Sequence, residues 1–114
     1  MQLETETRDN TLIITAMMDR IDAAIAIQFK DTMRDTAANG PARVVLDLSK
    51  VDFLDSSGLG AVVATMKLLA PEQTLELAGL TPNVEKVFRL TRMNSVFTIH
   101  KDKEAAFDDI AEAS

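Results

Sequence analysis

The sequence predicts an α/β fold in which an N-terminal β-hairpin precedes β-α units, giving a mixed, mainly parallel sheet of four or five strands with about four helices. Short β-branched runs alternate with helical patterns along the chain, and this order favours a largely parallel sheet with helices packed on it. No linker, repeat or low-complexity segment divides the chain. The length of 114 residues fits a single domain, which we expect to comprise residues 1–114.

The first half of the chain supplies a hairpin, a helix and a central strand. Residues 2–16 form two strand-like runs around an Asp-Asn turn pair, which predicts the hairpin. Asp22 can cap a helix whose apolar residues recur every four positions over 25–37, and the Asn-Gly-Pro at 39–41 ends this helix. The run at 44–48, VVLDL, is short and almost entirely apolar, as expected of a central parallel strand covered on both faces.

The second half adds two helical patterns, two short strands and a C-terminal helix. Apolar residues at helical spacing over 59–70 predict an amphipathic helix that ends before a proline. The alternating run at 75–77, LEL, indicates a strand nearer an edge of the sheet. The Thr-Pro pair at 81–82 is typical of an N-cap followed by the first helical position. We expect a last strand at 96–99 and a last helix at 104–113.

Composition and charge exclude several classes of function. The chain has no cysteine, so a disulfide or a thiolate metal site is not available, and its single histidine, His100, cannot form a metal cluster alone. Eighteen acidic against twelve basic residues give a net charge of −6, which disfavours direct nucleic-acid binding and attraction to membrane lipids. The sequence shows neither a secretory signal nor an apolar run of ~18 residues. We therefore expect a soluble cytoplasmic protein without a cofactor, whose partners are other proteins.

The most informative segment is 53–60, FLDSSGLG, where a strand runs directly into a helical pattern. In mainly parallel sheets, ligands and chemistry gather at the carboxyl ends of strands. A helix that starts near Ser57 presents unpaired N–H groups and partial positive charge, and no Glu or Gln stands at the spacing of a capping box. Gly58 and Gly60 leave the first turn open to close approach by another chain, at a helix-propensity cost of up to ~1 kcal/mol each. A role beyond capping and a plain serine N-cap explain this pattern equally well.

Nucleotide binding and serine catalysis are both disfavoured for this segment. The third glycine of a dinucleotide fingerprint is missing, and no Gly-Lys-Ser/Thr follows for triphosphate binding. The serines do not lie in Gly-X-Ser-X-Gly. The one candidate base, His100, belongs to a different segment and is expected to be a solvated surface side chain. We therefore predict that the chain is not an enzyme that uses Ser56.

A second acidic residue of interest, Asp19, follows the second predicted strand. If that strand lies beside the third, Asp19 and Asp55 come near the same rim of the sheet. Two neighbouring carboxylates can form a metal site or an acid–base pair, but nothing nearby completes either set, and Asp19 as an ordinary loop residue has comparable support. A phosphoserine carries about −1.5 to −2 charges, so phosphorylation here would make the rim strongly anionic.

Over nearly its whole length the chain resembles the STAS family, and specifically the anti-sigma factor antagonists of bacterial partner-switching systems. The strongest similarity is 44–60, VVLDLSKVDFLDSSGLG, which looks like the family's apolar strand followed by its Asp-Ser-Ser/Thr-Gly-Leu-Gly signature. Asp19 and the segments 80–91, LTPNVEKVFRLT, and 94–102, NSVFTIHKD, are similar to the family in order and spacing. Many members have Gly-Glu-Leu-Asp where this chain has Ala-Met-Met-Asp at 16–19.

This resemblance implies a STAS-like fold and a binding module that is switched by phosphorylation. Family members are phosphorylated on the serine directly after the motif's aspartate, which corresponds to Ser56. The unphosphorylated form binds an anti-sigma factor that is also an ATP-dependent serine kinase, which frees a sigma factor, and a metal-dependent serine phosphatase reverses the modification. The residues expected to contact the partner are Asp19, Asp55, Ser57, Gly58, Leu59 and Gly60. A non-switching STAS scaffold or a transporter-associated subunit is the alternative, and the sequence is also compatible with a weak homodimer.

Overall fold

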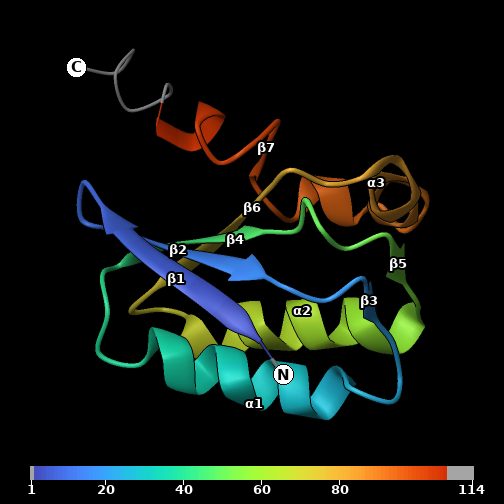
Figure 1. Cartoon of the computed structure of the whole chain (residues 1–114), viewed down its shortest axis with the longest axis horizontal. Coiled ribbons are helices and arrows are strands. Elements are labelled where there is room, and N and C mark those ends of the chain that lie inside the picture. The colour runs from blue at the N-terminus through green and yellow to red at the C-terminus, as the bar shows by residue number, and fades with distance from the viewer. Residues whose placement is uncertain (1, 108–114) are drawn as a thin grey trace.

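The computed structural model describes residues 2–107 and contains a five-stranded sheet in the order β1-β2-β4-β6-β7 (Figure 1). β1 is antiparallel to β2, and the other neighbouring pairs are parallel. The predicted mixed, mainly parallel sheet is therefore confirmed. Its strands are β1 (Leu3–Arg8), β2 (Thr11–Ala16), β4 (Arg43–Asp47), β6 (Thr74–Ala78) and β7 (Ile99–His100).

The first two strands form the hairpin expected at 2–16, with Arg8 paired to Thr11 across the turn. Both turn residues, Asp9 and Asn10, have positive φ angles, of 51° and 58°. Two consecutive positive φ angles are the conformation of a type I′ turn, whose twist matches that of the flanking strands. Asp and Asn adopt this conformation more readily than most residues, so the turn pair explains where the hairpin reverses.

Two long helices, α1 (Ala26–Ala37) and α2 (Ser56–Leu69), lie side by side on one face of the sheet (Figure 1). A third helix, α3 (Pro82–Leu90), and the short 3-10 helix η1 (Met93–Ser95) follow β6 in the chain. Residues 105–107 form a helical turn, and the rest of the helix predicted at 104–113 lies outside the described residues. Within residues 2–107, the helices are all too short or too polar to cross a membrane.

The main core lies between the sheet and the two long helices. Alternate residues of the strands point into it, and each large apolar side chain that leaves water contributes roughly 1.5–3 kcal/mol. Its buried side chains include Leu12, Ile14, Val44, Leu46 and Leu77 from the strands and Phe29, Met33 and Val62 from the helices. On the opposite face, Val45 and Ala78 pack against Ala106 and Phe107. Because β4 is buried on both faces between two parallel neighbours, the prediction of a central strand is confirmed.

Two strands of two residues each, β3 (Arg20–Ile21) and β5 (Phe53–Leu54), form a separate parallel pair that the sequence did not predict. Arg20 pairs with Phe53, and Ile21 pairs with Leu54. Runs this short have no readable periodicity. The pair nevertheless fixes the loop after β2 against the segment that enters α2.

The predicted cap of α1 is wrong, whereas the predicted N-cap position of α3 is confirmed. α1 begins at Ala26 without a side-chain cap, and Asp22 accepts a hydrogen bond from the Ala24 N–H at 3.1 Å in the turn before the helix. Asp22 as an N-cap was therefore wrong, because a three-residue turn separates it from the helix. Thr81 does occupy the N-cap position of α3, but its hydroxyl donates to the Val51 carbonyl at 2.8 Å.

The last strands also differ in detail. The strand expected at 96–99 is only Ile99–His100, because the N–H of Val96 donates to the Met93 carbonyl at 3.0 Å and continues the turn of η1. The strand expected nearer an edge at 75–77 lies one place in from the edge, between β4 and β7. The short β7 is the edge strand itself.

Candidate functional site

Two segments that are far apart in the sequence, 17–23 and 52–60, meet at one end of the sheet, where β3, β5 and the start of α2 lie together (Figure 1). The carbonyl of Asp19 accepts hydrogen bonds from the N–H groups of Asp52 at 2.8 Å and Phe53 at 3.2 Å. β2 and β4 are neighbours, as the prediction required. The segments that carry Asp19 and Asp55 therefore share one rim, which we call the motif rim.

Asp55, and not a serine, caps α2. Its Oδ1 accepts a hydrogen bond from the Gly58 N–H at 2.8 Å, and its Oδ2 accepts one from the Ala23 N–H at 3.1 Å. One carboxylate thus satisfies a free donor of the first helical turn and holds the loop that precedes α1. The alternative in which Ser56 or Ser57 is the N-cap was wrong, and the expectation of unpaired N–H groups at the start of the helix was wrong for the N–H of Gly58.

Ser56 and Ser57 are the first two residues of α2, and both are exposed. Because Asp55 supplies the cap, capping does not require either hydroxyl. The partial positive charge at a helix N-terminus favours a nearby anion. The start of α2 therefore presents two accessible hydroxyls in a setting that tolerates added negative charge.

The two glycines of the motif have different surroundings. Gly58 is buried, and a Cβ added there would collide with the carbonyl oxygen of Ile21 and lie 3.0 Å from Leu54 Cδ1. Gly60 is exposed, and a Cβ added there would meet no atom within 4 Å. Leu59, between them, is half-buried against the main core. The expectation that both glycines open the turn to another chain was wrong for Gly58, whose missing Cβ lets α2 approach β3.

Asp19 is exposed in the loop between β2 and β3. The two preceding residues, Met17 and Met18, are half-buried, and Met18 packs against the main core. The loop is therefore anchored by an apolar side chain while its acidic residue stays at the surface. In this position Asp19 adds negative charge to the motif rim.

The motif rim also carries an exposed pair that sequence reasoning missed. The guanidinium of Arg20 lies 5.2 Å from the ring centroid of Phe53, and Phe53 is 45% exposed. The sequence carried no readable signal for this pair, because its contact depends on the short β3–β5 pairing, in which Leu54 is buried and Phe53 faces outward. Arginine and aromatic side chains are enriched in protein interfaces, so this pair adds to the surface that a partner can use.

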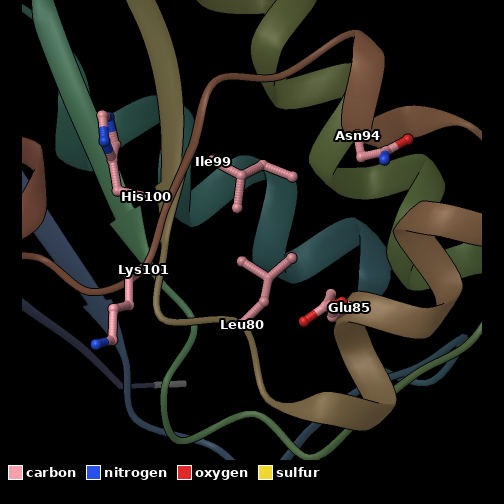
Figure 2. A pocket seen from close by; sticks show the side chains of 6 residues that line it. All are labelled: Leu80, Glu85, Asn94, Ile99, His100 and Lys101. Carbon is pink, nitrogen blue, oxygen red and sulfur yellow. The ribbon is translucent and has the colours of Figure 1, made fainter.

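A separate pocket of about 420 Å³ lies between β7 and α3 (Figure 2). Leu80 and Ile99 point into it, whereas the imidazole of His100 points away from both. His100 is buried, and its Nε2 lies 2.7 Å from Glu76 Oε1. The expectation of a solvated surface histidine was therefore wrong. The imidazole contacts Glu76 and is not placed as a base for Ser56.

Glu76 connects three adjacent strands through its carboxylate. It accepts hydrogen bonds from Arg43 of β4 at 2.8 and 2.9 Å and contacts His100 of β7. Burial alone would raise the pKa of the Glu76 carboxyl, but the hydrogen bonds and charges of Arg43 and His100 outweigh it and hold this pKa below its ordinary value. Arg43 also donates to the Ala106 carbonyl at 2.8 Å. The cluster therefore fastens the C-terminal turn to the sheet.

The two-carboxylate metal alternative for Asp19 and Asp55 gains no support from the structure. Across residues 2–107, no three or more His, Asp or Glu side chains come together in a way that could hold a metal ion. Asp55 already accepts two backbone hydrogen bonds. The rim is thus organised by backbone contacts rather than by a set of convergent ligands.

Comparison with known proteins identifies the family to which this chain belongs. The model of the STAS domain matches residues 2–106. BtrV of Bordetella bronchiseptica, named as a candidate anti-sigma factor antagonist, is 32% identical over 96 residues, which is 83% of each chain. The anti-sigma-B factor antagonist of Listeria monocytogenes is 29% identical over 98 residues, 85% of this chain and 86% of the relative. The crystal structure of an anti-sigma factor antagonist from Mycobacterium paratuberculosis matches with a TM-score of 0.83 at 24% identity, over 96% of this chain and 93% of that one. The chain therefore belongs to the STAS domain family.

Proposed function

We propose that this chain is an anti-sigma factor antagonist whose binding is switched by phosphorylation of Ser56. The unphosphorylated chain binds an anti-sigma factor that is also an ATP-dependent serine kinase, and a sigma factor is thereby freed. Phosphate on Ser56 ends this binding, and a metal-dependent serine phosphatase restores it. The chain is the substrate of both enzymes and catalyses neither step. ATP and sigma factors act in the cytoplasm, so the switch operates there.

The observation that carries the proposal is the exposed Ser56 at the first position of α2, beside a cap that Asp55 supplies. A serine that capped its own helix would have its oxygen occupied, and modification would remove the cap. Here the cap belongs to a neighbouring side chain. A phosphoryl group can therefore be added and removed while the start of α2 stays intact.

The phosphate charge would act differently on the chain and on its partner. Within the chain, the partial positive charge of the α2 N-terminus favours the dianion. Toward a partner, the phosphate adds about −1.5 to −2 charges to a rim that already carries Asp19, Asp52 and Asp55. Like-charge repulsion and desolvation then oppose docking. We expect phosphorylation to cost ~3 kcal/mol of binding free energy, which weakens the affinity for the partner over a hundredfold, while the chain stays folded.

The predicted partner-binding residues fall into two groups in this proposal. The exposed ones touch the partner directly, and the others hold the first turn of α2 in the geometry that the partner recognises. The exposed group comprises Asp19, Ser57 and Gly60, and the supporting group comprises Asp55, Gly58 and Leu59. The supporting group acts through the cap, the close contact with β3 and the half-buried leucine.

Intact-mass measurement after incubation with ATP and the purified anti-sigma factor kinase of the same organism tests the switch. We expect one phosphate on the wild type, none on Ser56→Ala, and one on Ser57→Ala, a matched control because both serines are exposed neighbours. Equal incorporation into Ser56→Ala would overturn the assignment of Ser56. An unmodified wild type would overturn the switch altogether and favour the non-switching STAS scaffold or transporter-associated subunit.

A pull-down with the same kinase tests the consequence for binding. The wild type and Ser56→Ala should retain the kinase, because neither carries charge at that position. Ser56→Asp should lose most of it, since a carboxylate at the start of α2 imitates part of the phosphate charge. Equal retention of all three proteins would show that charge at Ser56 does not control the interaction.

A further inference from the structure

Gly60 has no reason to be glycine within the described fold. Its φ angle is not positive, unlike that of Gly79, and a Cβ added at Gly60 would meet no atom within 4 Å. Alanine is the best helix former and glycine one of the poorest. A helix selected for stability alone would therefore carry alanine here, and the open space at Gly60 points to a use from outside the chain.

Gly60 belongs to the floor of a groove of about 370 Å³ between α1 and α2. The groove starts at Ser57 in the motif rim and extends about two helical turns along α2. The rest of its floor is made of small side chains, which are Ala23, Ala26, Ala61 and Ala64. Any Cβ at Gly60 would take up part of this groove, so glycine leaves the space next to the serines open.

Two larger residues of α1 give the groove its chemical character. Ile27 lines it and is 72% exposed, although it is a large aliphatic side chain on a helix with a well-buried opposite face. Among the described residues that line the groove, Lys30 is the only charged one. A ligand that fits must therefore offer apolar surface to Ile27 and the alanine floor, and negative charge to Lys30.

We propose that this groove is the second part of the kinase-binding surface. A segment of the anti-sigma factor kinase lies between α1 and α2, places an aliphatic side chain over Gly60 against Ile27, and brings a carboxylate to Lys30. This inference rests on the function proposed above and extends the contact surface beyond the motif. It also adds a reason for the switch, because a phosphate next to Ser57 repels an incoming acidic segment at the mouth of the groove.

Calorimetric titration with the purified kinase, loaded with a nonhydrolysable ATP analogue, tests the groove. We expect Ile27→Asp and Lys30→Glu each to weaken binding by roughly tenfold or more. Leu90→Asp is a matched control because Leu90 is 71% exposed on α3, and Lys86→Glu on the same helix repeats the charge change away from the groove. Both controls should bind the kinase with an affinity within about twofold of the wild type, because substitutions of surface residues outside an interface have small effects.

Gly60→Leu provides an independent variant, because leucine is a good helix former and its side chain would occupy the groove. We expect weaker binding with an unfolding midpoint in urea that is unchanged or higher. The groove proposal would be overturned if Gly60→Leu, Ile27→Asp and Lys30→Glu all bound the kinase with wild-type affinity. If the wild type were still phosphorylated on Ser56, the proposed function would remain intact. A wild type that neither binds the kinase nor accepts phosphate would overturn both.

Discussion

Two glycines of the same motif, Gly58 and Gly60, are separated by one residue in α2, and glycine is required at each for a different reason. At Gly58 the constraint is internal, since the carbonyl of Ile21 occupies the place of a Cβ. At Gly60 the described fold leaves that place empty. The comparison shows that one motif can contain a glycine required by internal packing and a glycine that leaves space for a partner, although the residue type is the same.

The largest expected effect comes from Gly58→Ala. The added methyl group would meet the Ile21 carbonyl and the Leu54 side chain, and backbone on one side cannot move aside as a flexible side chain would. We expect a loss of about 2–4 kcal/mol in the free energy of unfolding, in the range of overpacked or strained core sites. Urea denaturation monitored by circular dichroism measures it.

Gly60→Ala is the control for this experiment, because it makes the same chemical change two residues away. If Gly58→Ala unfolds at the same urea concentration as Gly60→Ala, the internal constraint on Gly58 does not exist. The contrast between the two glycines would then disappear. Binding to the kinase should not be used to compare them, since an unstable Gly58→Ala would lose binding for either reason.

Loss of the cap at Asp55 is the next largest effect. Asp55→Ala removes the acceptor for the Gly58 N–H and for the Ala23 N–H. We therefore expect the free energy of unfolding to fall by ~1–2 kcal/mol. Asp55→Asn keeps an oxygen for Gly58 but presents an N–H₂ group toward Ala23, so its loss should be intermediate. Urea denaturation of the wild type, Asp55→Asn and Asp55→Ala measures whether their stabilities fall in this order.

Asp52→Ala is a suitable control for the cap, because Asp52 is an exposed carboxylate of the same rim and does not cap the helix. Its stability should stay within about 0.5 kcal/mol of the wild type. A loss in Asp55→Ala no larger than that in Asp52→Ala would show that general charge, and not the cap, explains the effect. The close contact at Gly58 would then hold the start of α2 without help from Asp55.

Local sequence patterns predicted most of the fold because each rests on short-range physical chemistry. The Asp9-Asn10 pair set the hairpin through its positive φ angles, and the apolar run at 44–48 marked the central strand because a strand buried on both faces cannot carry polar alternation. The motif at 53–60 placed Ser56 at the start of a helix. These signals need no knowledge of distant residues.

The sequence did not predict the contacts that join distant segments. The pairing of β3 with β5 depends on two residues in each strand, and the second acceptor bond of Asp55 depends on Ala23, 32 residues earlier. His100 looked like a surface residue because its partner, Glu76, belongs to a different strand. The serines looked like caps because Ser is a leading cap residue, and the same is true of the aspartate before them. Which of these residues caps the helix is decided by the folded geometry, in which the Asp55 carboxylate lies 2.8 Å from the Gly58 N–H.

The smallest expected effect, and the one that separates stability from function, is a gain in Gly60→Ala. Replacing glycine by alanine in a helix stabilises it by up to ~1 kcal/mol, and at Gly60 the new methyl group meets no atom within 4 Å. We therefore expect a higher unfolding midpoint in urea together with weaker binding of the kinase. A protein that becomes more stable and binds less well cannot be explained by damage to the fold. Equal or tighter binding would show that the open space at Gly60 is not used by the partner, and a lower midpoint would show that an internal contact, rather than a partner, requires this glycine.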